Sequence, residues 1–129
     1  MFKVPKKTSV WKTEPIPDKY SILFAPELIK FIKDHKKIQT YRFGNKYDYL
    51  KPGDIVTLTE NNNPKTKIKA KISQKMSTTF INLPLNSPGH ESPRDKEHQR
   101  EIMTGYYAYL GRKIKDDDPF LIFDFELVD

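Results

Sequence analysis

The architecture of the chain is set by residues 27–59, which read ELIKFIKDHKKIQTYRFGNKYDYLKPGDIVTLT. After Pro26, apolar residues recur at helical spacing from Leu28 onward while charged residues face away, a pattern typical of a helix packed on a core. The Pro-Gly-Asp sequence at 52–54 predicts a tight turn, because proline presets φ and glycine accepts a positive φ. We therefore expect a helix, a short extended segment, a turn and a strand at 55–59.

Between this helix and the turn, three polar side chains lie within six positions of one another: Lys37, Thr40 and Arg42. The guanidinium of Arg42 can hold a phosphate or a base-edge carbonyl through two hydrogen bonds. The hydroxyl of Thr40 can attack a carbonyl if a neighbouring base takes its proton. Lys37 can be that base if burial or a nearby cation lowers its pKa. The plainer alternative is that both cations are solvated and that Thr40 belongs to a half-buried strand.

The composition predicts one folded domain over residues 1–129, with a flexible basic segment at 1–7. Lys and Arg number 23 against 17 Asp and Glu, and the net charge of +6 is compatible with a polyanionic partner. There is no cysteine, and the three histidines lack metal-ligand spacing, so we expect no metal and no cofactor. We find neither a membrane-spanning apolar run nor the apolar core of a signal peptide, and therefore expect a cytoplasmic protein, monomeric by default.

Strand and helix patterns alternate along the rest of the chain. Short apolar patterns predict further strands at 8–13, 20–24, 65–72 and 121–127. A second helix is predicted over 93–110, with Ser92 and Asp95 as a capping box and Gly111 as its stop. Short strands with two helices predict an α+β fold, a small and partly open β-barrel of mainly antiparallel strands with the helices flanking it.

Two side-chain patterns outside the polar cluster allow more than one interpretation. Lys67, Lys69 and Lys71 alternate with apolar residues and line one face of a strand. This face is either solvated and protects the strand from edge pairing, or forms an electrostatic surface for nucleic-acid phosphates. The tyrosines of the second helix, which are Tyr106, Tyr107 and Tyr109, are interpreted as core and rim residues, with a protein-interaction surface as the alternative.

The spacing Lys37-x-x-Thr40-x-Arg42, with a helix before it and Leu-Lys-Pro-Gly-Asp-Ile-Val at 50–56 after it, resembles the signature of ASCH domains. These domains belong to the PUA-like superfamily of small β-barrels. The resemblance covers residues 22–59 closely and extends through the element order to residue 128. It implies a pseudo-barrel with a ligand cleft beside the first helix, lined by the three motif residues and Lys46, in a family generally thought to bind RNA.

One bacterial branch of single-domain ASCH proteins hydrolyses N(4)-acetylcytidine and releases acetate. In that branch the motif Lys and Thr are catalytic, together with a Glu that lies before or within the second helix. Lys37 and Thr40 match the first two positions. Three glutamates are candidates for the third, Glu91, Glu97 and Glu101, and Glu97 is our preferred assignment.

Two functions from different classes follow. The first is binding of RNA, a nucleotide or a nucleoside, which requires only the motif and the basic charge. The alternative is an amidohydrolase that deacetylates N(4)-acetylcytidine with Thr40 as nucleophile and Lys37 as base. Hydrolysis also requires the third residue, so the sequence is compatible with an enzyme and with a binding domain.

Overall fold

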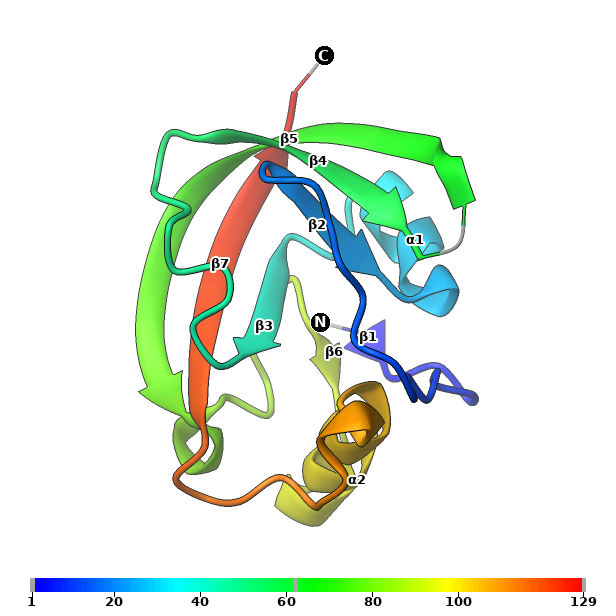
Figure 1. The fold of residues 1–129 in the computed structure, drawn as a ribbon, viewed down its shortest axis with the longest axis vertical. Coiled ribbons are helices and arrows are strands. Elements are labelled where there is room, and N and C mark those ends of the chain that lie inside the picture. Colours follow the sequence, from blue (N-terminus) through cyan, green and yellow to red (C-terminus); the bar gives the residue numbers. More distant parts are fainter. Residues whose placement is uncertain (1, 62, 129) are drawn as a thin grey trace.

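The core of the fold is one strongly curled sheet (Figure 1). The computed structural model describes residues 2–61 and 63–128. Within them the sheet has five strands in the order β2-β4-β5-β7-β3. Their bounds are β2 Ser21–Phe24, β3 Gln39–Phe43, β4 Ile55–Glu60, β5 Asn63–Thr79 and β7 Pro119–Leu127. The pairing of β2 with β4 is parallel and the other pairings are antiparallel.

The curl of the sheet depends on β5, which is 17 residues long and pairs with both β4 and β7. The register of β5 against β7 shifts between Ile72 and Gln74, and that of β4 against β5 shifts between Thr59 and Glu60. Extra residues of this kind bend a strand and increase its twist. The sheet therefore closes into a half-barrel, and the predicted α+β class with a partly open barrel is confirmed.

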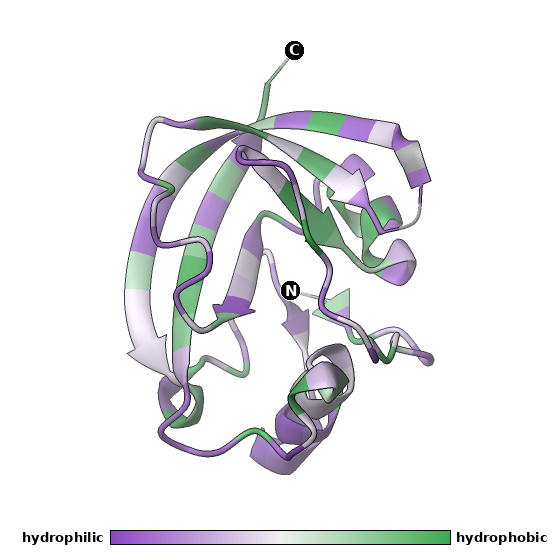
Figure 2. Cartoon of the chain, in the orientation of Figure 1, coloured by the Kyte–Doolittle hydropathy of each residue, from purple (hydrophilic) through white to green (hydrophobic). Residues whose placement is uncertain are grey.

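Hydrophobic residues recur along the strands of the sheet and in α1 (Figure 2), and their buried side chains form the main apolar core. On β4, Val56 and Leu58 are buried while their neighbours are partly or fully exposed, as the two-residue period of a strand requires. Helix α1, Pro26–Lys33, covers this core with Leu28, Ile29 and Ile32. The amphipathic helix and the strand after the Pro-Gly-Asp turn are both as predicted.

The second helix begins later and ends earlier than predicted, because residues 108–110 form a separate 3-10 turn. Helix α2 spans Lys96–Tyr106, and the carboxylate of Asp95 caps it by accepting a hydrogen bond of 2.8 Å from the N–H of His98. The capping box at Ser92 is therefore wrong, because Glu91–Ser92 forms a short strand, β6, that pairs with β1, Phe2–Lys3. Two short 3-10 turns, η1 at Phe80–Asn82 and η2 at Ala108–Leu110, complete the described elements.

The strand predicted at 8–13 is wrong as well. These residues form no strand, because their backbone groups bond elsewhere. The N–H of Ser9 donates to the Glu27 carboxylate, and the N–H of Trp11 donates to the carbonyl of Gly105. The prolines at 5, 15 and 17 also interrupt strand pairing on either side. Within the described residues, no helix is long and apolar enough to span a membrane.

We predict that Ile72→Ala lowers the free energy of unfolding by about 3 kcal/mol, because the residue is fully buried at the centre of β5 and its loss leaves a cavity. Urea unfolding monitored by circular dichroism measures this change. The matched control is Met76→Ala on the same strand, which is 60% exposed and should change stability by less than about 0.5 kcal/mol. Equal effects of the two substitutions would contradict the assignment of the core face.

Candidate functional site

The three motif residues lie in the interior of the half-barrel. Thr40 and Arg42 are two positions apart on β3 and therefore share a face. Lys37 precedes β3, and its N–H donates to the carbonyl of Phe31 near the end of α1. The chain reverses there through His35, whose φ is 60°. The exposed fractions of Lys37, Thr40 and Arg42 are 1%, 3% and 9%. The two cations, Lys37 and Arg42, are therefore buried rather than solvated.

Lys37 is paired with Glu91 of β6. The ammonium nitrogen of Lys37 lies 2.7 Å from Oε2 of Glu91, and the Glu91 side chain is 10% exposed. Burial lowers the pKa of Lys37 from its ordinary value, although the adjacent carboxylate opposes that shift. Burial alone would raise the pKa of Glu91, but the charge of Lys37, the electrostatic effect of His90 and the hydrogen bonds to the carboxylate together outweigh it, and the pKa of this carboxyl is lowered.

The other two candidate glutamates lie elsewhere. Glu97 is on the outer side of α2, with a side chain that is 77% exposed and pairs with Arg100 at 3.2 Å. Glu101 is also exposed on α2. The structure thus brings Glu91, rather than our preferred Glu97, next to Lys37. Sequence spacing could not separate the three, because the loop before α2 determines which carboxylate reaches the barrel interior.

Arg42 is used inside the protein. Its Nε donates to the hydroxyl oxygen of Thr40 at 3.0 Å, and one terminal nitrogen donates to the carbonyl of Leu23 at 2.7 Å. The guanidinium also lies 4.4 Å from the ring centre of Phe24. These contacts orient the hydroxyl of Thr40 and favour negative charge on its oxygen. They use two of the five N–H donors of the guanidinium.

His90 is a member of the site that sequence reasoning missed. Its ring stacks on Tyr41 at 3.8 Å, and its Nδ1 donates to the backbone carbonyl of Glu91 at 3.0 Å. Burial, reinforced by the charge of Lys37, lowers the pKa of His90 to about 4. The imidazole is therefore neutral at physiological pH. The only feature of the sequence that could have indicated His90 was its position next to the candidate Glu91. The histidines have no metal-ligand spacing that would have singled it out.

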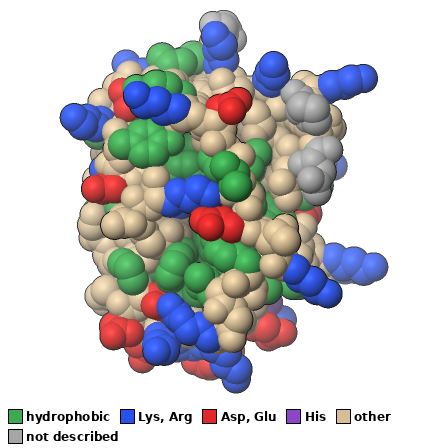
Figure 3. Space-filling model, viewed as in Figure 1, with side chains coloured by type: hydrophobic (Ala, Val, Ile, Leu, Met, Phe, Trp, Pro, Cys, Tyr) green, Lys and Arg blue, Asp and Glu red, His purple; other side chains and the backbone are tan. Residues whose placement is uncertain are grey.

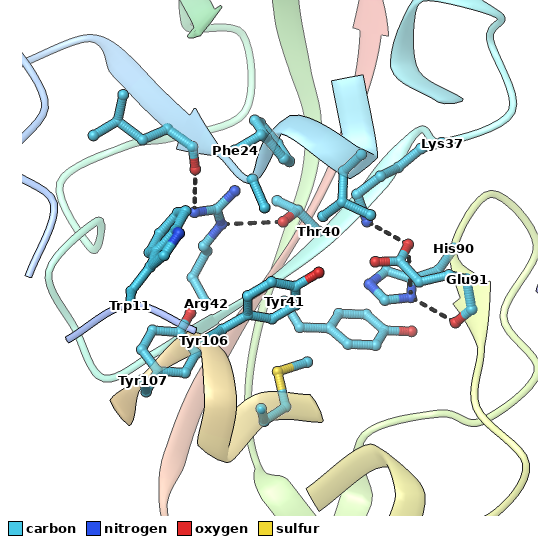
Figure 4. A pocket seen from close by; sticks show the side chains of 14 residues that line it. Trp11, Phe24, Lys37, Thr40, Tyr41, Arg42, His90, Glu91, Tyr106 and Tyr107 are labelled. Carbon is cyan, nitrogen blue, oxygen red and sulfur yellow. Dashed lines mark hydrogen bonds and ion pairs between the residues drawn. The ribbon is translucent and has the colours of Figure 1, made fainter. Parts of the chain in front are cut away.

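These residues line a cavity of about 40 Å³ that also has an aromatic wall, Trp11, Phe24, Tyr106 and Tyr107 (Figure 4). In the close-up, Thr40 lies between Trp11 and Arg42 on one side and Lys37, His90 and Glu91 on the other. A second cavity, of about 300 Å³, shares Trp11, Leu23, Arg42 and Tyr107 with the first. The two cavities are therefore adjacent.

The remaining predicted site residues lie outside the small cavity. Lys46 lines the larger cavity, where its ammonium contacts the carboxylate of Glu14 at 3.3 Å and the carbonyl of Pro15. Lys67, Lys69 and Lys71 are exposed along β5. On the face shown in Figure 3, basic and acidic side chains are interspersed around apolar ones. Across the described residues, no cluster of three or more His, Cys, Asp or Glu could hold a metal.

Comparisons with known proteins show the fold. No protein-family model and no curated protein sequence matches the chain. A solved ASCH domain from Lactobacillus crispatus is similar with a TM-score of 0.55 and 15% identity over 76% of this chain and 68% of that one. The hypothetical protein PH0355 is similar with a TM-score of 0.58 and 20% identity over 84% of this chain and 97% of its own. The chain thus has an ASCH-like fold, as the sequence resemblance predicted.

We predict a specific pH dependence of stability from His90. Because its pKa is about 4 in the folded protein and 6.5 ordinarily, the unfolded chain takes up the proton first as the pH falls. The contribution of this residue is complete above pH 6.5 and is lost as the pH falls towards 4. Proton uptake by His90 in the unfolded chain should therefore lower the free energy of unfolding by about 2 kcal/mol between pH 7 and pH 5.

Urea unfolding of the wild type and of His90→Phe at both pH values tests this dependence. Phenylalanine keeps a ring against Tyr41 but does not titrate, so the variant should lose about 2 kcal/mol less than the wild type over the same pH interval. The same loss in both proteins would contradict a buried, neutral His90.

Proposed function

We propose that the chain binds an acylated pyrimidine nucleoside in the cavity beside β3 and hydrolyses its amide, with N(4)-acetylcytidine as the substrate. The observation that carries this proposal is the buried ion pair of Lys37 and Glu91, 2.7 Å long, in the same cavity as the hydroxyl of Thr40. It combines the nucleoside-binding and hydrolase hypotheses in a single site.

The burial of this pair supports a small-ligand site. A buried ion pair contributes little to stability compared with apolar residues of the same size. Buried ionisable groups with shifted pKa values that line a cavity are typical of functional sites. The lowered pKa of Lys37 also increases its share of neutral amine, which is the form that can accept a proton.

In the first step of the proposed reaction, the oxygen of Thr40 attacks the carbonyl carbon of the amide and its proton passes to the neutral amine of Lys37. The carbon–nitrogen bond then breaks, and Lys37 returns the proton to the leaving nitrogen. Cytidine leaves and the acetyl group remains as an ester on Thr40. In the second step, water attacks this ester, acetate departs and Thr40 recovers its proton.

Each neighbouring contact has a role in this scheme. Glu91 holds the amine of Lys37 in place through the 2.7 Å contact. The Nε of Arg42, 3.0 Å from the oxygen of Thr40, stabilises negative charge as the proton leaves. Among the described residues Lys37 and Thr40 share no hydrogen bond, and such contacts commonly form only when the substrate is bound.

We predict that purified protein releases acetate from N(4)-acetylcytidine and that Lys37→Ala, Thr40→Val and Glu91→Gln each lower kcat/KM by about 10³-fold, because each removes a group that the reaction needs. Acetate release measured by a coupled assay gives these values.

The matched control for Glu91→Gln is Glu97→Gln, which makes the same chemical change on the exposed side of α2 and should leave turnover within about twofold. Thermal unfolding of each variant verifies its fold. Turnover that survives Thr40→Val, or that is lost in Glu97→Gln, would overturn the assignment.

RNA binding is a second candidate, supported by the exposed row of Lys67, Lys69 and Lys71 on β5. The ASCH-like fold agrees with this function, since that family is thought to bind RNA. The lysine row lies apart from both cavities. It would therefore contact phosphates without help from Arg42, which is 9% exposed and lies in the barrel interior.

If the row binds RNA, replacing its three lysines by glutamine should reduce the magnitude of the negative slope of log affinity against log salt by about 2, since each single-strand phosphate contact contributes about 0.7. Fluorescence anisotropy with a labelled single-stranded RNA measures this slope. A variant with the same charge loss on α1 and the turn after it, Lys30, Lys33 and Lys36 to glutamine, is the control. Equal slopes in both variants would show that RNA affinity depends on the net charge of the protein and not on a binding surface at Lys67, Lys69 and Lys71.

A further inference from the structure

The N-terminal arm, residues 2–11, closes one side of the half-barrel. The N–H and the hydroxyl of Ser9 both donate to the carboxylate of Glu27 on α1, at 2.6 and 2.7 Å. Two residues later, the N–H of Trp11 donates to the carbonyl of Gly105 at 3.0 Å, and its carbonyl accepts from the N–H of Tyr109 at 2.9 Å. The arm therefore joins the start of α1 to the end of α2.

These bonds fix the indole of Trp11 at the junction of the two cavities. The ring is half-buried and lines both of them. It lies 6.1 Å from the ring of Tyr106, whose hydroxyl donates to the same Glu27 carboxylate at 3.0 Å. One carboxylate thus holds both the arm and the neighbouring aromatic ring in place.

The sizes of the two cavities restrict how a ligand can lie. The cavity beside Thr40, of about 40 Å³, is much the smaller of the two and suits a short acyl group better than a pyrimidine ring. The adjacent cavity of about 300 Å³ can receive the ring. Its walls include the aromatic side chains Trp11, Phe43, Tyr107 and Tyr109, and flat apolar surfaces of this kind stack on bases.

We propose that Trp11 is a specificity-determining residue on which the base of the ligand stacks. The acyl group enters the small cavity beside Thr40, while the base and its sugar occupy the larger cavity. The inference deepens the proposed function and rests on it. It implies that the ligand of the site is a planar heterocyclic amine that carries a short acyl group.

The chain itself supplies the probe, because Trp11 is its single tryptophan. In the Thr40→Val protein, where turnover is blocked, N(4)-acetylcytidine should quench the fluorescence of Trp11 in a saturable manner. Calorimetric titration of Trp11→Leu in the same background should show affinity weaker by about 10- to 100-fold, the range expected for loss of one base stack. Trp11→Phe should bind within about threefold, because it keeps an aromatic face and thereby controls for folding.

Val10→Ala is the matched control on the arm, since Val10 is 58% exposed and should leave binding unchanged. In the active protein, Trp11→Leu should raise KM with little change in kcat, as expected for a contact equal in ground and transition states. N(4)-benzoylcytidine, whose acyl group is itself a ring, should not be cleaved.

The outcomes separate this inference from the proposed function. Saturable quenching and weak binding by Trp11→Leu, without acetate release by the wild type, would overturn hydrolysis and leave stacking supported. Acetate release with an unchanged KM in Trp11→Leu would overturn stacking and leave hydrolysis supported. Binding of neither N(4)-acetylcytidine nor cytidine to the Thr40→Val protein would overturn both.

Discussion

The ion pair between Lys37 and Glu91 is the constraint on which the site depends. Neither charge is tolerated alone at this depth, because an unpaired buried charge costs several kcal/mol. Each residue therefore requires the other, across a separation of 54 positions in the chain. The pair connects the turn after α1 to β6, and β6 is held in turn by its pairing with β1. The first residues of the chain thus support the position of Glu91.

A second carboxylate, Glu27, organises the opposite side of the site. It accepts hydrogen bonds from Ser9 and from Tyr106, and so joins the N-terminal arm, α1 and α2 at one point. The half-barrel alone would leave the cavity open on this side. The arm closes it with the one tryptophan of the chain, so the adjacent cavities have a charged end at Lys37 and Glu91 and an aromatic end at Trp11.

The position of Arg42 distinguishes a small-ligand site from a phosphate clamp. This residue is 9% exposed and its guanidinium contacts the Thr40 hydroxyl, the Leu23 carbonyl and the face of Phe24, so an extended polyanion has little access to it. Its fixed positive charge instead acts on two oxygen atoms of the protein, those of the Thr40 hydroxyl and the Leu23 carbonyl. In the two proposals, the exposed lysines of β5 would contact RNA phosphates and the cavity beside β3 would hold the nucleoside, so they use separate surfaces of the protein.

Local patterns in the sequence were sufficient for the scaffold. The helical period after Pro26, the Pro-Gly-Asp turn and the two-residue period of the strands act over a few residues, and they predicted α1, β4, β5, β7 and the partly open barrel. They also predicted that Lys37, Thr40 and Arg42 belong together, because these residues are near neighbours in the chain. The predictions of a strand at 8–13 and of the start of α2 were wrong. In both places the backbone bonds to a distant segment instead: Trp11 to Gly105, and the strand of Ser92 to that of Lys3.

Tertiary structure alone selected Glu91 over Glu97, placed His90 against Tyr41 and brought Trp11 to the cavity. Each of these contacts joins segments far apart in the sequence, and nothing in the local pattern of one segment specifies its partner. The choice of carboxylate depended on which one the barrel could bury opposite a lysine, and burial is a property of the folded chain as a whole.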